Sequence, residues 1–248
     1  MHVPARVVGA VVALATLAAI PAHAGAEPSG QLALVLDGVE SGYVRSTQGS
    51  AGTKRTLVIS TAEPTAPILT AVRALLEGKT ESRSLVLSTP AVIQKAKDAR
   101  LVDVRLPSYA GGSSDLALTF EVGSTSTGPS LRLASDRAKP RGVELASFRM
   151  SVGDLPTSGA TRLDAVTLKN KEGAALPGAF TFDVPSRDAP AYLAWAKKPA
   201  ARDGAIEYVS KTGEPALAVK LSGCTPSSAT IDGPVTHVVV TCVRARPI

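Results

Sequence analysis

The stretch LALVLDGVESGYV, residues 32–44, predicts an apolar strand, a tight turn and a returning strand. Asp37-Gly38 supplies the turn, because glycine accepts the positive φ that a short hairpin loop requires. Beyond this hairpin, β-branched and alternating segments predict further strands at Thr56–Ser60, Ser84–Ser88, Leu101–Leu106 and Leu116–Val122. The first half of the chain is therefore expected to be mostly β.

One helix interrupts these strands, between residues 65 and 78. Thr65 can cap it, Pro67 lies in the first turn, where its missing N–H costs nothing, and Gly78 follows its end. Its apolar residues recur at helical spacing: Ile68, Leu69, Val72, Leu75 and Leu76. This stripe predicts a helix that packs against a sheet.

The same order of elements recurs in the second half. Strands are predicted at Phe148–Val152, Thr161–Leu168, Phe180–Val184, Ile206–Ser210, Leu217–Leu221 and Val235–Val243. A second helix is predicted from about Asp188 to Lys198, with Asp188 or Ser186 as its cap, Pro190 in its first turn and Pro199 as its stop.

These elements predict a mostly β (α+β) protein of two tandem domains, each a small β-barrel or sandwich with one flanking helix. The domains span residues 25–123 and 146–248, and the polar segment 124–145 is interpreted as a linker. An overlay of the halves places Cys224 at Tyr109 and Cys242 at Phe120, so that a covalent contact replaces an aromatic one. Chance similarity between two β-rich halves is the alternative to duplication.

The first 24 residues predict export. An apolar run, Val7–Ile20, follows Arg6 and precedes Ala22-His23-Ala24, the small-x-small pattern of a signal-peptidase site. A retained membrane anchor is the alternative, but the run is shorter than the ~20 residues that cross a bilayer. We therefore expect a periplasmic or secreted protein with no stable membrane insertion after cleavage.

The only two cysteines, Cys224 and Cys242, are predicted to form a disulfide, because an exported chain meets an oxidising compartment. Closing this loop would stabilise the protein by ~3 kcal/mol. A metal site would need more ligands than this pair and His237, the only histidine after residue 24. No metal and no cofactor are expected.

The formal charge is +6, but the basic residues are dispersed among acidic ones and aromatic residues are few. Nucleic-acid binding would favour a concentrated basic face with aromatic residues between the charges, so this composition disfavours it. Catalytic motifs are also lacking. His237 lies in a strand pattern, and no serine lies in a Gly-x-Ser-x-Gly nucleophile motif. Gly78-Lys79-Thr80 is similar to the end of a phosphate-binding loop, but it follows a helix, whereas such a loop precedes one. The aspartates considered for a carboxylate site are scattered, and most are expected in turns or on exposed strand faces: Asp37, Asp98, Asp103, Asp115, Asp154 and Asp183. Tyr192 and Trp195 are interpreted as core residues instead of a sugar platform. No catalytic residue is assigned.

The segment from Leu34 to Ser46 resembles the opening of the tail-tube proteins of contractile phage tails and related injection systems: an apolar strand, a DG turn and a G-[FY]-x-x-[SV] return strand. The helix ending Leu75–Lys79 and the passage Leu101–Pro107 before Leu116–Val122 are similar to the same family. The resemblance implies a β domain that assembles through strand edges into rings that stack into a tube, with a tandem chain forming a ring from half as many copies. A signal peptide and a cysteine pair depart from the family pattern.

Three functions follow for testing. The first is an exported, non-enzymatic structural protein that self-associates into rings or a tube as a homo-oligomer, because open strand edges accept a neighbouring strand. The second is a monomeric periplasmic or secreted binding module for a protein partner in the envelope. The third is a secreted hydrolase of unfamiliar type that uses Asp37 or Asp103.

Overall fold

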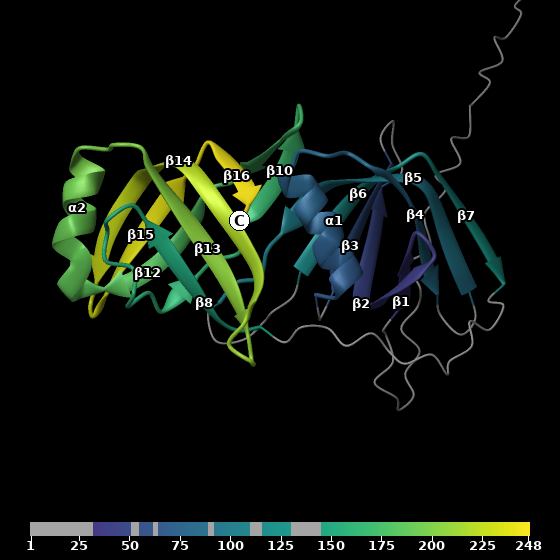
Figure 1. The fold of residues 1–248 in the computed structure, drawn as a ribbon, viewed down its shortest axis with the longest axis horizontal. Coiled ribbons are helices and arrows are strands. Elements are labelled where there is room, and N and C mark those ends of the chain that lie inside the picture. Colours follow the sequence, from purple (N-terminus) through teal and green to yellow (C-terminus); the bar gives the residue numbers. More distant parts are fainter. Residues whose placement is uncertain (1–31, 51–54, 62–63, 89–91, 110–115, 130–144) are drawn as a thin grey trace, which may run out of the picture.

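The computed structural model describes residues 32–50, 55–61, 64–88, 92–109, 116–129 and 145–248, so the predicted signal peptide and Asp115 lie outside the described residues. It is mostly β, as the sequence predicts (Figure 1). The first half contains β1 (Leu32–Leu36), β2 (Val39–Ser50), β3 (Arg55–Thr61), α1 (Ala66–Leu76), β4 (Ser82–Ser88), β5 (Val92–Arg105), β6 (Leu116–Val122) and β7 (Ser124–Pro129). The second contains β8 (Leu145–Val152), β9 (Arg162–Leu163), β10 (Thr167–Lys171), β11 (Ala174–Pro177), β12 (Phe180–Pro185), a 3-10 turn (Ser186–Asp188), α2 (Ala189–Lys197), β13 (Arg202–Ser210), β14 (Pro215–Asp232), β15 (Val235–Thr241) and β16 (Arg244–Pro247).

Strands of the first half form a closed cycle of antiparallel neighbours. From β1 the order is β2, β3, β6, β5 and β4, and β4 pairs with β1 again. The predicted turn between β1 and β2 has positive φ at both Asp37 (49°) and Gly38 (80°), as a two-residue hairpin loop requires. β7 lies outside the cycle, paired with β5.

The second half repeats these neighbour relations. Each strand of the first half has a counterpart in the second: β8 matches β1, β9 matches β2, β12 matches β3, β13 matches β4, β14 matches β5, β15 matches β6 and β16 matches β7. The matching pairs are β8–β13, β13–β14, β14–β15, β15–β12, β12–β9 and β14–β16, all antiparallel. In the described part of the chain β8 pairs only with β13, so the cycle that closes in the first half stays open here.

The register of the matching pairs agrees, including their irregularities. Arg83 lies opposite Ala99 in β4–β5, and Arg202 lies opposite Cys224 in β13–β14; a β-bulge follows each pair. Each bulge holds a residue with positive φ, 54° at Asp98 and 62° at Gly223. Shared bulges at matching positions are a stronger likeness than shared strand order, because bulges are retained as specific features of a fold.

The same register corrects the overlay made from the sequence. Cys224 matches Ala99, and the β5–β6 and β14–β15 registers make Cys242 match Val122 instead of Phe120. Ala99 and Val122 are both buried. The disulfide therefore stands in the place of two small apolar side chains, and the predicted exchange of an aromatic contact for a covalent one is wrong.

The helices begin and end largely where the sequence predicts, but their caps differ. Gly78 has φ 81° and follows α1, with Lys79 N–H donating to the Ala74 carbonyl, a Schellman-type end. Thr65 does not cap α1 with its side chain; its hydroxyl donates to the Ser41 carbonyl at 2.8 Å. Likewise, neither Asp188 nor Ser186 caps α2 by a side-chain bond, since the Ser186 hydroxyl donates to the Gly233 carbonyl.

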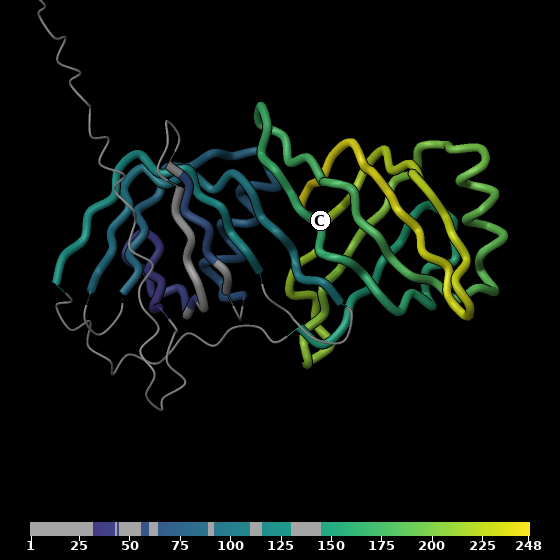
Figure 2. Tube along the Cα trace, turned by 180° about the vertical axis from the view of Figure 1, so that it is seen from behind, coloured from purple at the N-terminus to yellow at the C-terminus, as the bar shows by residue number. Residues whose placement is uncertain are grey.

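A hairpin of the second half, β10–β11, joins the two halves (Figure 2). β10 pairs with the end of β5, with Lys169 opposite Asp103, and β11 pairs with β16, with Ala175 opposite Ala245. The result is one continuous sheet of 16 strands. At its tip the hairpin abuts α1, where a side chain at Gly78 would overlap the carbonyl oxygen of Gly173.

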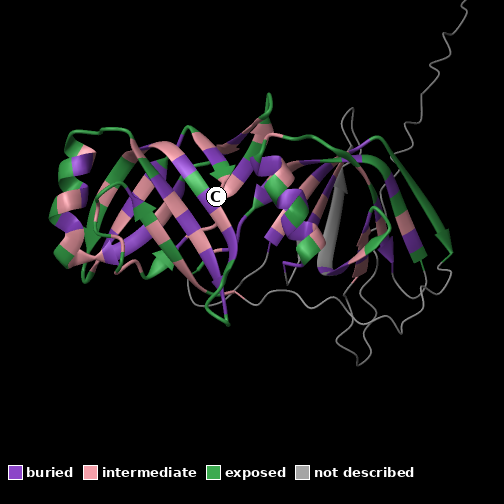
Figure 3. Cartoon of the chain, viewed as in Figure 1, coloured by how far each residue is buried: buried purple, intermediate pink, exposed green. Residues whose placement is uncertain are grey.

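Buried side chains of the two halves form one hydrophobic cluster, and strand residues alternate between buried and more exposed positions (Figure 3). Tyr192 and Trp195 of α2 are core residues, as predicted, with 0% and 3% exposure. Among the described residues, no helix is both long and apolar enough to cross a membrane.

Two segments differ from the sequence prediction. Ser124–Pro129, assigned to the linker, forms β7, and the rest of that segment to residue 144 lies outside the described residues. The single strand predicted at Thr161–Leu168 is broken into β9 and the start of β10, because the chain leaves the β9–β12 pairing there to reach the first half.

Candidate functional site

His237 is held by a carboxylate that sequence reasoning missed. Its Nδ1 lies 2.6 Å from Oδ1 of Asp183, directly opposite across β15 and β12. Asp183 is not one of the aspartates in turns or on exposed faces, since it lies in β12 and is only 6% exposed. The two residues are 54 positions apart, and only the pairing of β12 with β15 brings them together.

This pair belongs to a polar row across neighbouring strands of the second half. Arg162 lies opposite Asp183, and Thr230 lies opposite His237. The Arg162 guanidinium is 4.0 Å from the Asp183 carboxylate and donates from Nε at 2.9 Å to Asp164. The row therefore alternates cation, anion and histidine across β9, β12 and β15.

The environment of His237 favours its charged form. The hydrogen bond with Asp183 raises the pKa of His237 above its ordinary value, and Asp232, 3.7 Å from Nε2, adds to this while burial opposes it. Both ring nitrogens thus face carboxylates. A catalytic base needs one ring nitrogen directed at a nucleophile, whereas among the described residues each nitrogen of His237 lies within 4 Å of a carboxylate.

Two of the other aspartates hold the turn that follows the first strand of each half. Asp37 accepts a bond from Arg83 at 2.9 Å, and in the matching turn of the second half Asp154 forms an ion pair with Arg202. Since Arg83 and Arg202 are matching residues, both halves use the same arginine to tie down the first turn. These carboxylates have a structural use in the fold.

Asp98 and Asp103 are not brought together as a carboxylate pair. Asp98 occupies the bulge of β5 with φ 54°, whereas Asp103 faces Lys169 at the joint with β10. Burial raises the pKa of Asp103, and Lys169 acts against this shift. The hydrolase hypothesis that rests on Asp37 or Asp103 gains no catalytic geometry from these contacts.

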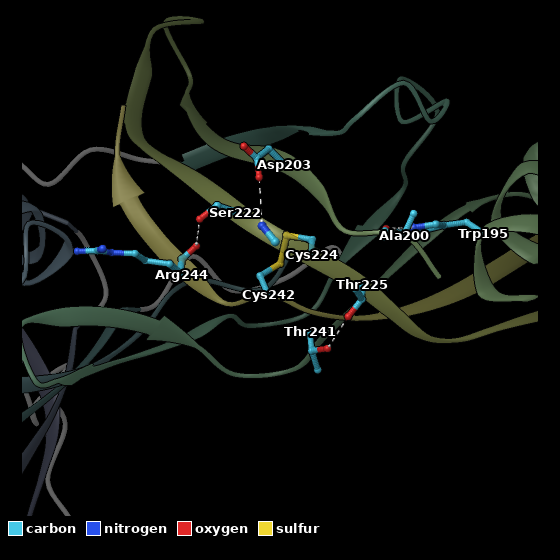
Figure 4. Close-up of a disulfide and its surroundings, with 10 residues drawn as sticks. Trp195, Ala200, Asp203, Ser222, Cys224, Thr225, Thr241, Cys242 and Arg244 are labelled. Atoms are coloured by element: carbon cyan, nitrogen blue, oxygen red, sulfur yellow. Dashed lines mark hydrogen bonds between the residues drawn. A yellow bond between two sulfur atoms is a disulfide. The ribbon is translucent and has the colours of Figure 1, made fainter. Parts of the chain in front are cut away.

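The structure joins Cys224 and Cys242 in a disulfide with an S–S distance of 2.08 Å (Figure 4). Around it, Gly223 N–H donates to Asp203 Oδ1 at 3.1 Å, and the Thr225 and Thr241 hydroxyls lie 3.4 Å apart. The bridge fastens the middle of β14 to the end of β15. Neither thiol is free to act as a nucleophile or a metal ligand.

A shallow hollow of about 390 Å³ lies where the first half meets β9 and β12. Arg105, Ser108, Arg162, Asp164 and Phe180 line part of it. Arg162 is already bound to Asp164, so Arg105 is the cation left facing the hollow. In the described ranges of the chain, no three His, Cys, Asp or Glu side chains are grouped to hold a metal ion.

The open strand edges in the described part of the chain include that of β8, which pairs only with β13, and the outer sides of β7 and of the far end of β14. The β7 edge is the outer side of Ser124–Pro129, whose residues are all exposed and uncharged. The β14 edge is the outer side of residues 228–231, which pair on one side only, with β15. Unpaired N–H and C=O groups along such edges accept a further strand.

The matching edges of the other half are filled. The stretch of β5 that matches the β14 edge pairs with β10, and β16, which matches β7, pairs with β11.

No protein-family model matches the sequence, and no curated protein is significantly similar to it. The open strand edges are therefore the best-defined candidate for a functional surface.

Proposed function

We propose that this chain is an exported, non-enzymatic structural protein that assembles with copies of itself through strand edges. The observation that carries the proposal is the joint between its halves: β10–β11 links the strands of both halves into one continuous sheet. The chain thus already associates by strand addition with a unit like itself. The resemblance of the opening strands to tail-tube proteins supports the same reading.

Export is part of this proposal. It is supported by the apolar run and small-residue site at residues 7–24 and by the disulfide, which persists in oxidising compartments. Determining the N-terminal residue of protein recovered from a secreting host checks it directly. A chain that keeps residues 1–24 in the cytoplasm contradicts this part and leaves the assembly proposal to be tested separately.

Assembly is tested by sedimentation velocity and electron microscopy of the purified chain over a wide concentration range. The expected result is a mass that rises with concentration, with rings or filaments in the images. A protein that sediments as a monomer up to millimolar concentration overturns the proposal.

A second function, a monomeric binding module for a protein partner, is supported by α2. The first-half helix α1 buries six residues, including Leu75 and Leu76 at its end, whereas α2 buries three and ends in exposed Lys198 and Pro199. The helix of the second half is therefore less suited to receive another unit. This function predicts a monomer that captures a different envelope protein.

A further inference from the structure

The joint between the halves has an unfilled counterpart at the other end of the molecule. In the filled joint, Val104 and Arg105 of β5 pair with β10. The β5–β6 and β14–β15 registers make Arg105 match Thr230, because Arg105 lies opposite Ala117 and Thr230 lies opposite His237 in the same register. The β14 edge therefore stands where β5 receives β10.

The residue that follows this edge is the second observation. Leu106, next after Arg105, is 0% exposed, and its N–H donates to the Val166 carbonyl at 2.8 Å within the joint. Its counterpart Ile231 is 51% exposed. A large aliphatic side chain is thus present at both positions, buried where the joint is filled and half-exposed where it is open.

The β7 edge shows the same relation in the first half. Thr125 lies opposite Ala96 in β7–β5, and Ala245 lies opposite Leu221 in the matching pair β16–β14. Ala245 is fully buried and pairs with β11, whereas Thr125 is exposed. The filled joint runs from a β5-type edge through the β10–β11 hairpin to a β16-type edge. The described part of the chain retains one open edge of each type.

Resting on the proposed self-assembly, we propose that the β14 edge, with Ile231, binds the first half of a second copy at its β7 edge, so that chains join head to tail. Such a heterologous contact leaves one free edge of each kind at the ends and grows into a ring or a filament. Because α2 lacks the apolar end of α1, this contact depends on strand pairing and Ile231, and it is weaker than the joint within the chain.

The test blocks each edge separately with lysines, which oppose strand addition. One variant carries Ser228→Lys and Thr230→Lys on β14, and the other carries Ser124→Lys and Ser126→Lys on β7. A control variant adds the same two charges at exposed positions outside the strands, Thr70→Lys on α1 and Ser158→Lys in the loop after β8. Each edge variant alone is expected to remain monomeric at concentrations where the wild type and this control assemble.

Mixing the two edge variants gives the decisive result. Each joint needs one β14 edge and one β7 edge, so the mixture is expected to form one-to-one dimers that do not grow, seen by sedimentation or mass photometry. If one edge variant dimerises alone, or if assembly is unchanged in both, the head-to-tail contact is refuted while self-assembly stands. A wild type that never assembles refutes the proposed function itself.

A second pair of variants tests the apolar contact. Ile231→Ser is expected to raise the concentration for half-assembly about fivefold to tenfold, because a half-exposed aliphatic side chain no longer becomes buried. Val39→Ser removes an aliphatic side chain of similar exposure, 54%, away from both edges and is expected to leave that concentration unchanged. Equal effects of the two substitutions would remove Ile231 from the contact.

Discussion

The strongest quantitative test of the likeness between the halves lies at the matching bulges. In the first half Asp98 occupies the bulge and faces Gly123; in the second Gly223 occupies it and faces Val243. A Cβ at Gly223 would lie 2.9 Å from Val243 Cγ2, and a Cβ at Gly123 would lie 3.0 Å from Asp98 Cβ. At both sites, one member of the facing pair is glycine.

Gly223→Asn is the perturbation. The left-handed backbone at φ 62° costs a residue with a side chain about 1 kcal/mol, and asparagine tolerates it best. Moving the Val243 side chain aside costs about 1–2 kcal/mol more. The free energy of unfolding is therefore expected to fall by about 2–3 kcal/mol.

Val243→Gly alone is expected to cost about 0.5–1 kcal/mol, since this side chain is 70% exposed and the loss is mainly backbone entropy. The double variant recreates the first-half arrangement and should lose about 1–2 kcal/mol less than the sum of the single variants. Urea unfolding of the disulfide-bonded protein, followed by the fluorescence of Trp195, the only tryptophan, measures all three variants. Strictly additive losses would refute the reasoning, as would a Gly223→Asn variant as stable as the wild type.

Three further predictions concern single contacts. Replacing the disulfide by the matching first-half residues, Cys224→Ala with Cys242→Val, should lower the free energy of unfolding by about 3 kcal/mol in urea titrations. The buried first-half pair, Ala99 and Val122, shows that these smaller side chains pack at such a site. A loss below about 1 kcal/mol would contradict the argument from loop entropy. Asp183→Asn should lower the pKa of His237, measured by NMR of the protein that starts after residue 24, in which His237 is the only histidine. Because the pKa of His237 is raised in the folded state, its contact with Asp183 stabilises the protein fully below the unfolded pKa near 6.5, and this stabilisation is lost as pH rises through the folded pKa. A wild-type free energy of unfolding that does not decline over that pH range would contradict the prediction. Thr65→Val should cost about 1–2 kcal/mol, because the buried Ser41 carbonyl loses its donor, while Thr65→Ser keeps that bond and serves as the control.

Local patterns in the sequence were sufficient for the elements whose signals are local. The Asp37-Gly38 turn, Pro67 in the first turn of α1 and Gly78 just after its end follow from backbone preferences of a few neighbouring residues, and the structure has them in these places. Tyr192 and Trp195 likewise follow from helical spacing. Such signals need no knowledge of distant partners.

What the sequence could not supply depends on pairing between distant strands. β7 has the composition of a linker and is a strand only because β5 lies beside it. The Asp183–His237 contact and the register that matches Cys224 to Ala99 also exist only once strands are aligned. The overlay failed because it followed residue similarity, whereas the fold preserves bulge positions.

The β10–β11 hairpin has a practical consequence for anyone who divides this protein. It is encoded with the second half, yet it supplies the neighbour of β5 and contacts the end of α1 in the first half. A fragment ending before β8 would leave Asp103 and Leu106 without their pairing partners from the second half. The complementary fragment would carry the β10–β11 hairpin without the strand β5 that it pairs with. The two fragments should therefore be poorly soluble when expressed separately and should become soluble when they are co-expressed. The protein is thus better treated as one cooperative folding unit than as two independent domains.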